Sequence, residues 1–317
     1  LGDSSYADIS RTHMIIRDAI EFREQHFSWD YDSSLVELTG TYSTCYFDQS
    51  QPFWELRFSN PAARNRIYWD GFEAKIVNVY STLNVATYQL DLNWDTLRVQ
   101  AGATLNFQYD PQTLNTYEID ARTDCFGFAT IMAETKDDSL VINCLSDSLT
   151  TSYLLLQNIT NGIPQKPINA YSSIDLSGNV DITFSLDQPR TLYWVGNTGV
   201  WQDSSHWSLN SGGQGGECIP TPVDSVVFDN SSFSLPGQSV DLETYDAYCG
   251  DFVITPNTSF SMTWGSGATL KVFKDMQLQS SFTLSGNWNG ALEFKGSDSA
   301  YFDPAEVAIA MNVAIEK

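Results

Sequence analysis

The sequence predicts an all-β protein, an elongated right-handed β-solenoid with β-helix-like repeats and a Trp- and Cys-rich connecting module. Tandem β-sandwiches are the alternative. Three observations predict this fold class: a composition poor in helix formers, alternation of apolar and polar residues, and similar stretches that occur in the same order near both ends of the chain.

The composition favours strands and excludes two classes of partner. Thr, Ser, Asn, Asp, Val and Ile are plentiful, and 13% of the residues are aromatic. The 16 Lys and Arg residues stand against 39 Asp and Glu, a net charge of -23, which repels nucleic-acid phosphates and anionic lipid headgroups. No run of 18 apolar residues suggests a membrane span. The sequence therefore predicts no nucleic-acid binding and no membrane insertion of this segment.

Alternation with a period of two gives each expected strand one buried face. It is clearest in three sets: Tyr88, Leu90, Leu92 and Trp94; Leu105, Phe107 and Tyr109; and Val180, Ile182, Phe184 and Leu186. Turn-forming clusters separate the sets and are spaced closely enough for a sandwich or a solenoid. A helix-like stretch at residues 14–25 is equally readable as strands.

An internal repeat is the third observation. Residues 15–20, 36–40 and 67–70 resemble residues 272–277, 282–286 and 300–303, in the same order. We therefore expect a β-rich repeat unit over residues 1–190, a Trp/Cys module over 191–255 and the start of the next repeat unit over 256–317. On this interpretation the chain begins and ends part-way through repeat units, and the natural protein continues at least on the C-terminal side.

Five cysteines lack the short paired spacings of a zinc site: Cys45, Cys125, Cys144, Cys218 and Cys249. In a chain with an extracellular composition they are disulfide candidates. Pairing Cys218 with Cys249 and Cys125 with Cys144 would close loops of moderate length and leave Cys45 single, although spacing alone does not fix the connectivity. The alternative is a set of buried free thiols.

The most specific signature lies in residues 193–254, which contain Trp194, Trp201 and Trp207, a Gly-rich loop and two of the cysteines. One interpretation is a compact flap that covers or joins an open solenoid edge, with the three tryptophans in its core. The other is a sugar-binding platform of exposed indole rings. The core interpretation is favoured because large aromatic side chains are heavily buried on average.

This segment resembles a module of giant secreted repeat-containing surface adhesins of Bacteroidetes, including gliding-motility adhesins and cargo of type IX secretion. The matching elements are a Trp-Val-Gly start, His206-Trp207, the segment from Cys218 to Pro222, and Cys249. The resemblance implies export to the cell surface, a role in adhesion or motility, and a disulfide between Cys218 and Cys249. It also implies O-glycan acceptors at Asp-Ser/Thr-apolar triplets: Thr96, Ser139, Ser148, Ser225 and Ser299.

The sequence carries no recognisable catalytic motif. The three histidines, His13, His26 and His206, show no metalloprotease spacing. Candidate carboxylate pairs such as Asp30 with Asp32 and Asp137 with Asp138 are too common in an acidic chain to single out a glycosidase. We therefore predict no enzyme, no catalytic residue, no metal site and no cofactor, with calcium at Asp-rich turns left open.

The predicted function is that of a cell-surface adhesin or filamentous display protein, which acts by binding and mechanical extension. Its expected partners are surface glycans, other cell-surface or secretion-machinery proteins, and further copies of its own repeats. Carbohydrate binding through exposed tryptophans is the alternative, and a polysaccharide-degrading enzyme is the weaker one.

Overall fold

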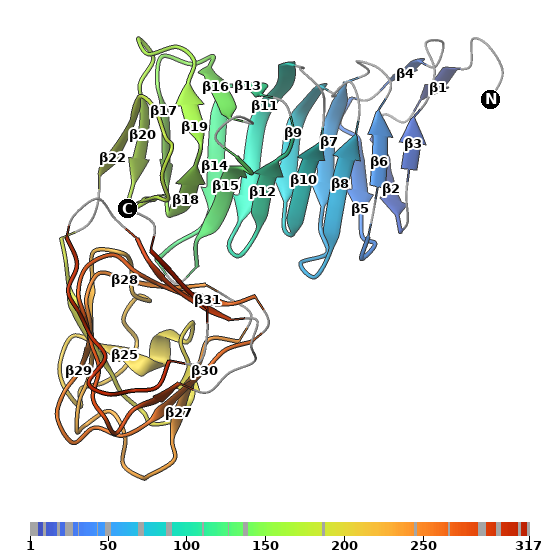
Figure 1. Ribbon diagram of the computed structural model, residues 1–317. Helices are drawn as coiled ribbons and strands as arrows, with labels where there is room; N and C mark the ends of the chain where they lie inside the picture. Colours follow the sequence, from blue (N-terminus) through green and yellow to red (C-terminus); the bar gives the residue numbers. More distant parts are fainter. Residues whose placement is uncertain are drawn as a thin grey trace. The chain divides into compact units, whose positions relative to one another are not determined.

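In the computed structural model, the chain folds into two compact units, Leu1–Leu186 and Asp187–Lys317, each built almost entirely of short strands (Figure 1). The structure describes residues 6–8, 11–17, 20–22, 28–30, 32–42, 44–47, 52–68, 73–86, 91–109, 111–125, 127–135, 139–185, 188–243, 246–265, 267–284, 290–295, 299–309 and 312–315.

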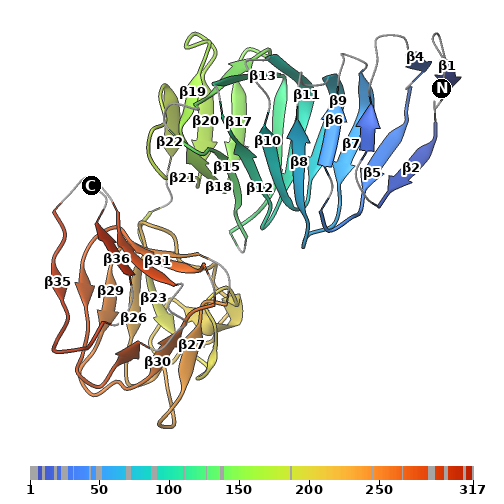
Figure 2. The ribbon, with the colours of Figure 1, turned by 45° about the vertical axis from the view of Figure 1, so that its right-hand side comes forward.

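The first unit is a stack of coils whose strands form long parallel sheets (Figure 2). One sheet contains β2 (His13–Ile16), β5 (Leu35–Leu38), β7 (Phe53–Phe58), β9 (Glu73–Val79), β11 (Asp91–Gln100), β13 (Gln112–Thr116), β16 (Leu140–Cys144) and β19 (Ile159–Asn161), with β14 (Glu118–Arg122) also paired to β11. We call it sheet B.

A second sheet, sheet C, contains β3 (Ile20–Phe22), β6 (Thr44–Phe47), β8 (Arg64–Tyr68), β10 (Thr82–Ala86), β12 (Thr104–Phe107), β15 (Ala129–Ala133), β18 (Leu154–Gln157) and β21 (Ile174–Asp175). Two smaller parallel sheets are formed by β17 (Leu149–Ser152), β20 (Ile168–Tyr171) and β22 (Ile182–Ser185), and by β1 (Tyr6–Asp8) with β4 (Ser28–Asp30).

Parallel register between consecutive coils stacks like residues on one another. Leu56 pairs with Val77, Val77 with Leu97 and Leu97 with Ile119, and all four side chains are buried. Burial of each such aliphatic side chain contributes roughly 1.5–3 kcal/mol. Apolar rows of this kind fill the interior, which explains the alternation seen in the sequence.

Sharp corners between strands use single residues in the left-handed conformation. Tyr153 (φ 53°) separates β17 from β18, and Asn158 (φ 56°) separates β18 from β19. The buried amide of Asn158 donates to the carbonyl oxygen of Ala133 at 3.0 Å, which ties the corner to the preceding coil. A Cβ on Gly178 would lie 2.0 Å from Asn158 Oδ1, so only glycine fits there.

The described residues of the second unit form three sheets. The first contains β25 (Trp207–Ser208), β23 (Thr191–Trp194), β26 (Ser225–Phe228), β29 (Phe252–Ile254), β32 (Met276–Gln277) and β35 (Phe302–Asp303). The second contains β24 (Gly199–Val200), β27 (Ser239–Asp241), β30 (Ser261–Thr263) and β33 (Thr283–Leu284). The third contains β28 (Ala247–Cys249), β31 (Thr269–Val272), β34 (Ala291–Phe294) and β36 (Asn312–Ile315), and a 3-10 turn, η1 (Ser204–His206), precedes β25.

The predicted β-solenoid is confirmed: the described strands stack in parallel to give about 12 turns. The sandwich alternative is wrong, because the named strands pair in parallel from coil to coil, with the β23–β25 pair antiparallel. Residues 191–255 fold in the same unit as residues 256–317, and the boundary between the units falls at Leu186–Asp187. Within the helix-like stretch at residues 14–25, the described residues form β2 and β3 strands.

The stretches aligned as an internal repeat fall on β2, β5 and β8 in the first unit and near β31, β33 and β35 in the second.

In the predicted alternation, Leu92, Trp94, Leu105 and Phe107 are buried. Ile182 and Phe184 are partly buried and pack against the core. Tyr109 and Val180 were expected to face inward and are instead 43% and 48% exposed. Tyr109 has a left-handed backbone (φ 74°) just after β12, which breaks the alternation. Tyr88, Leu90 and Leu186 lie outside the described residues.

Candidate binding face of the first unit

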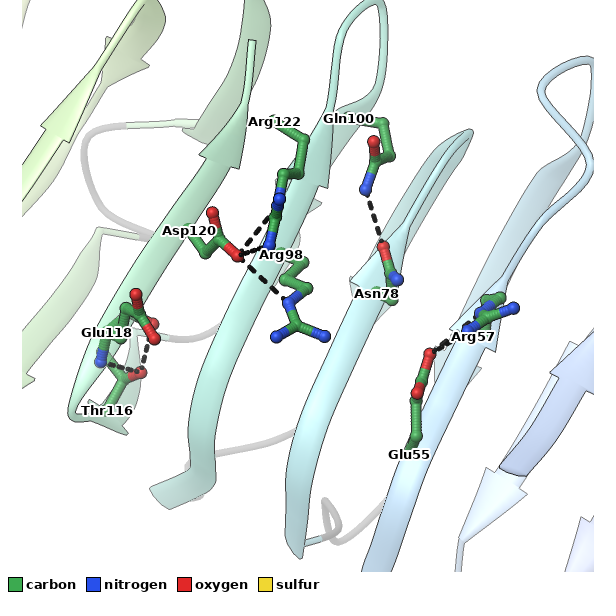
Figure 3. A network of polar contacts seen from close by, with 9 residues as sticks. All are labelled: Glu55, Arg57, Asn78, Arg98, Gln100, Thr116, Glu118, Asp120 and Arg122. Atoms are coloured by element: carbon green, nitrogen blue, oxygen red, sulfur yellow. Dashed lines mark hydrogen bonds and ion pairs between the residues drawn. The ribbon is translucent and has the colours of Figure 1, made fainter. Parts of the chain in front are cut away.

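Sheet B carries a row of polar side chains on its outer surface. Arg57, Asn78, Arg98 and Asp120 stand in register on β7, β9, β11 and β14. They alternate along their strands with the buried residues described above, so they lie on the outer side of the sheet; Arg57, Arg98 and Asp120 are partly exposed, whereas Asn78 is 5% exposed. With their neighbours they form what we call the polar face (Figure 3): Glu55, Arg57, Asn78, Arg98, Gln100, Glu118, Asp120 and Arg122. Figure 3 also labels Thr116, which is fully buried.

Two arginines share one carboxylate at the centre of this face. Arg98 Nε donates to Asp120 Oδ2 at 3.1 Å, while Arg122 reaches the same oxygen through Nε at 2.9 Å and Nη2 at 2.7 Å. The side chains of Arg98, Asp120 and Arg122 are 30%, 21% and 55% exposed. Two guanidinium groups and one carboxylate carry a charge of about +1, which is balanced by Glu118, exposed two residues before Asp120 on the same side of β14.

Arg57 and Glu55 form a second, neutral pair two strands away from Arg98. Arg57 Nε and Nη2 donate to Glu55 Oε1 at 2.8 and 2.6 Å. The pKa of Glu37, the next residue in the row, is lowered overall. Burial raises it, but hydrogen bonds from Ser59 and His13 and the positive charges of His13 and Arg57 outweigh the effect of burial.

Amide and hydroxyl groups form further hydrogen bonds near the charged pairs. Gln100 Nε2 donates to Asn78 Oδ1 at 3.0 Å, and the Thr116 hydroxyl donates to the carbonyl oxygen of Glu118 at 3.0 Å. An amide ladder runs nearby on the same sheet, in which Asn115 donates to Asn93 and Asn143 donates to Asn115, both at 2.9 Å. These bonds hold the outward side chains at the spacing of the strands, about 4.8 Å.

The arrangement is suited to binding and presents planar donors and acceptors at regular intervals. Guanidinium, amide and carboxylate groups form paired hydrogen bonds with carboxylates and with neighbouring hydroxyls of a ligand. This face was not predicted from the sequence, because Arg57, Asn78, Arg98 and Asp120 are 20 to 22 residues apart and meet through coil stacking. One sequence signal could have predicted the face. Charged or amide residues recur every 20 to 22 positions on the polar side of the alternating strands.

The favoured interpretation of Trp194, Trp201 and Trp207 as core is confirmed and the sugar-platform alternative is wrong, because these side chains are 0%, 1% and 0% exposed. They pack edge to face, with ring centroids 5.1 Å apart for Trp194–Trp207 and 4.9 Å for Trp201–Trp207, and Phe228 lies against all three. β25 pairs with the edge of β23, so this segment covers a solenoid edge, as the core interpretation predicted.

The predicted disulfide pairings, Cys218 with Cys249 and Cys125 with Cys144, are also not formed. Cys144 and Cys249 are buried free thiols, as is Cys45, whereas Cys125 and Cys218 are disulfide-bonded. Cys144 and Cys249 lie on β16 and β28 and point into the packed interior of their units. Burial raises the pKa of Cys45 to about 12.

The five predicted O-glycan acceptors differ in their surroundings. Ser148 and Ser299 are exposed, and Thr96 and Ser139 are half-buried. Ser225 donates its hydroxyl hydrogen to Asp251 Oδ2 at 2.6 Å. Thr96 lies on β11 two residues from Arg98, at the margin of the polar face.

No family model matches the sequence, and no curated protein or solved structure is significantly similar to it. Among the described residues, no helix has the length and apolar character needed to span a bilayer. Within the same residues, no three His, Cys, Asp or Glu side chains converge as metal ligands would.

Proposed function

We propose that this protein is an extracellular adhesive or display protein that binds its ligand along the polar face. The observation that carries the proposal is the register of Arg57, Asn78, Arg98 and Asp120 across four strands of one sheet. A β-solenoid holds such a row on a close-packed core, so the side chains are already ordered before a ligand arrives. Binding by the face therefore costs little conformational entropy.

Two further features support a location outside the cell. Cys125 and Cys218 are disulfide-bonded, which is typical of oxidising compartments. The resemblance of residues 193–254 to secreted surface adhesins of Bacteroidetes points in the same direction. On this proposal the stacked coils present the face at a surface, and the partners are surface glycans or surface proteins.

The proposal is tested by immobilising the protein and measuring its binding to a glycan array and to whole bacterial cells. We expect retention that falls when Arg57, Arg98 and Arg122 are all replaced by Gln. Retention that is unchanged in this variant would contradict the role of the polar face. Release of reducing sugar from mixed polysaccharides would contradict the non-enzymatic function.

A further inference from the structure

We infer that Arg98 and Arg122 bind the carboxylate group of an acidic glycan. This inference rests on the proposed function and specifies the ligand class of the same face. It starts from the charge balance of the polar face, in which Arg57, Arg98 and Arg122 offset Glu55, Glu118 and Asp120 while Arg98 and Arg122 share the single carboxylate of Asp120. In a chain with a net charge of -23, a face that carries two neighbouring guanidinium groups and no net negative charge is a local site for an anion.

The guanidinium group of Arg98 has donors that remain free to bind a ligand. Its Nε is held by Asp120, and its two terminal nitrogens donate to no acceptor in the described part of the chain (Figure 3). A guanidinium fixed through Nε presents its terminal N–H groups as a rigid fork, which matches the two oxygens of a carboxylate. Asp120 thus orients Arg98 and Arg122 and leaves donors for a ligand.

The surroundings of Arg98 fit the rest of a sugar ring. Gln100 lies beside it and offers its amide oxygen to hydroxyls, while its Nε2 is bonded to Asn78, which is 5% exposed. In the neighbouring row Ile76 pairs with Thr96, so a half-buried apolar side chain and a hydroxyl stand next to the charged group. A pyranose has the same combination of apolar C–H groups and hydroxyls.

Charge distinguishes this ligand from denser polyanions. Nucleic acids and heavily sulfated chains place charges so closely that the overall negative charge of the protein repels them. A polyuronate carries one carboxylate per sugar, fewer charges per unit length than duplex nucleic acid or a heavily sulfated chain, and it brings one carboxylate to the Arg98–Arg122 site with its hydroxyls beside the amide of Gln100. The regular strand spacing lets an extended chain run across β9, β11 and β14.

Binding is measured with the full chain and three probes: polygalacturonate, its methyl-esterified neutral form, and dextran sulfate. We expect the strongest binding to polygalacturonate, with affinity that falls as salt rises. Arg98→Gln and Arg122→Gln should each weaken it about tenfold or more, since tenfold corresponds to about 1.4 kcal/mol, close to the low end for a hydrogen bond to a charged group. Arg98→Lys keeps the charge and loses the fork, so it should weaken binding as well.

Arg64→Gln is the matched control, because Arg64 is an exposed arginine on β8 of the other sheet and its loss changes the net charge equally. Equal binding of the esterified and acidic chains, stronger binding of dextran sulfate, or an equal loss in Arg64→Gln would overturn the inference. Retention on a glycan array without binding to polygalacturonate would overturn the ligand class and leave the proposed function standing. Thermal unfolding checks each variant, and Arg122→Gln carries the test alone if Arg98→Gln does not fold.

Discussion

Arg190 forms an ion pair with Asp224, whose side chain is 1% exposed, at an Nη2–Oδ2 distance of 2.6 Å. The same carboxylate accepts hydrogen bonds from the backbone N–H of Arg190 and from Nε of that residue, and from the N–H and hydroxyl of Thr221. The pair joins the residue before β23 to the residue before β26. It therefore fastens the first coil of the second unit to the next.

Asp224→Ala should destabilise this unit by about 3 kcal/mol, the low end for breaking a buried ion pair, because Arg190 remains partly in contact with water. Hydrogen exchange followed by mass spectrometry should show faster exchange in β23 and β26. Asp147→Ala is the control, since Asp147 is exposed in the first unit. Unchanged protection of β23 in Asp224→Ala would show that the pair contributes little.

Trp207→Ala tests whether the tryptophan segment is core. Its ring is fully buried, and its Nε1 donates to the carbonyl oxygen of Trp201 at 2.8 Å. Truncating a buried tryptophan costs about 3–5 kcal/mol. Trp54→Ala, at a side chain that is 37% exposed on β7, should cost much less. Urea unfolding of both variants measures the difference, and equal midpoints would contradict a core role for Trp207.

The sequence predicted strands better than sites, for a physical reason. Alternation reports which side of a strand is buried, as Leu92 and Trp94 show, because burial is local to the strand. Register depends on coil length, which varies: Leu97 follows Val77 by 20 residues, whereas Leu140 follows Gln112 by 28. Alternation therefore could not place Arg98 beside Asp120, or show which cysteines form a disulfide.

Glycosylation of the predicted acceptor residues should depend on how exposed their hydroxyl groups are. If the triplets implied by the resemblance are used by the native host, glycopeptide mass spectrometry should find Ser148 modified and Ser225 unmodified. Ser148 is exposed just before β17, whereas the Ser225 hydroxyl is engaged by Asp251 at 2.6 Å. Modification of Ser225 in folded protein would contradict the hydrogen bond as a barrier. Protein made in a host without the glycosylation pathway serves as the unmodified reference.

The five cysteines should differ in their reactivity towards alkylating reagents. Alkylation of denatured, non-reduced protein should label Cys45, Cys144 and Cys249, and reduction should add Cys125 and Cys218. In the folded protein Cys45 should resist alkylation at pH 8–9, because burial raises its pKa from 9.0 to about 12 and removes the reactive thiolate.

Between these two pKa values the unfolded chain loses the Cys45 proton and the folded chain keeps it. The contribution of Cys45 to stability is therefore complete below pH 9 and is lost as the pH rises towards 12. Cys45→Ala should flatten this alkaline decline in urea-unfolding midpoints, and fast labelling of Cys45 in the native state would contradict its burial.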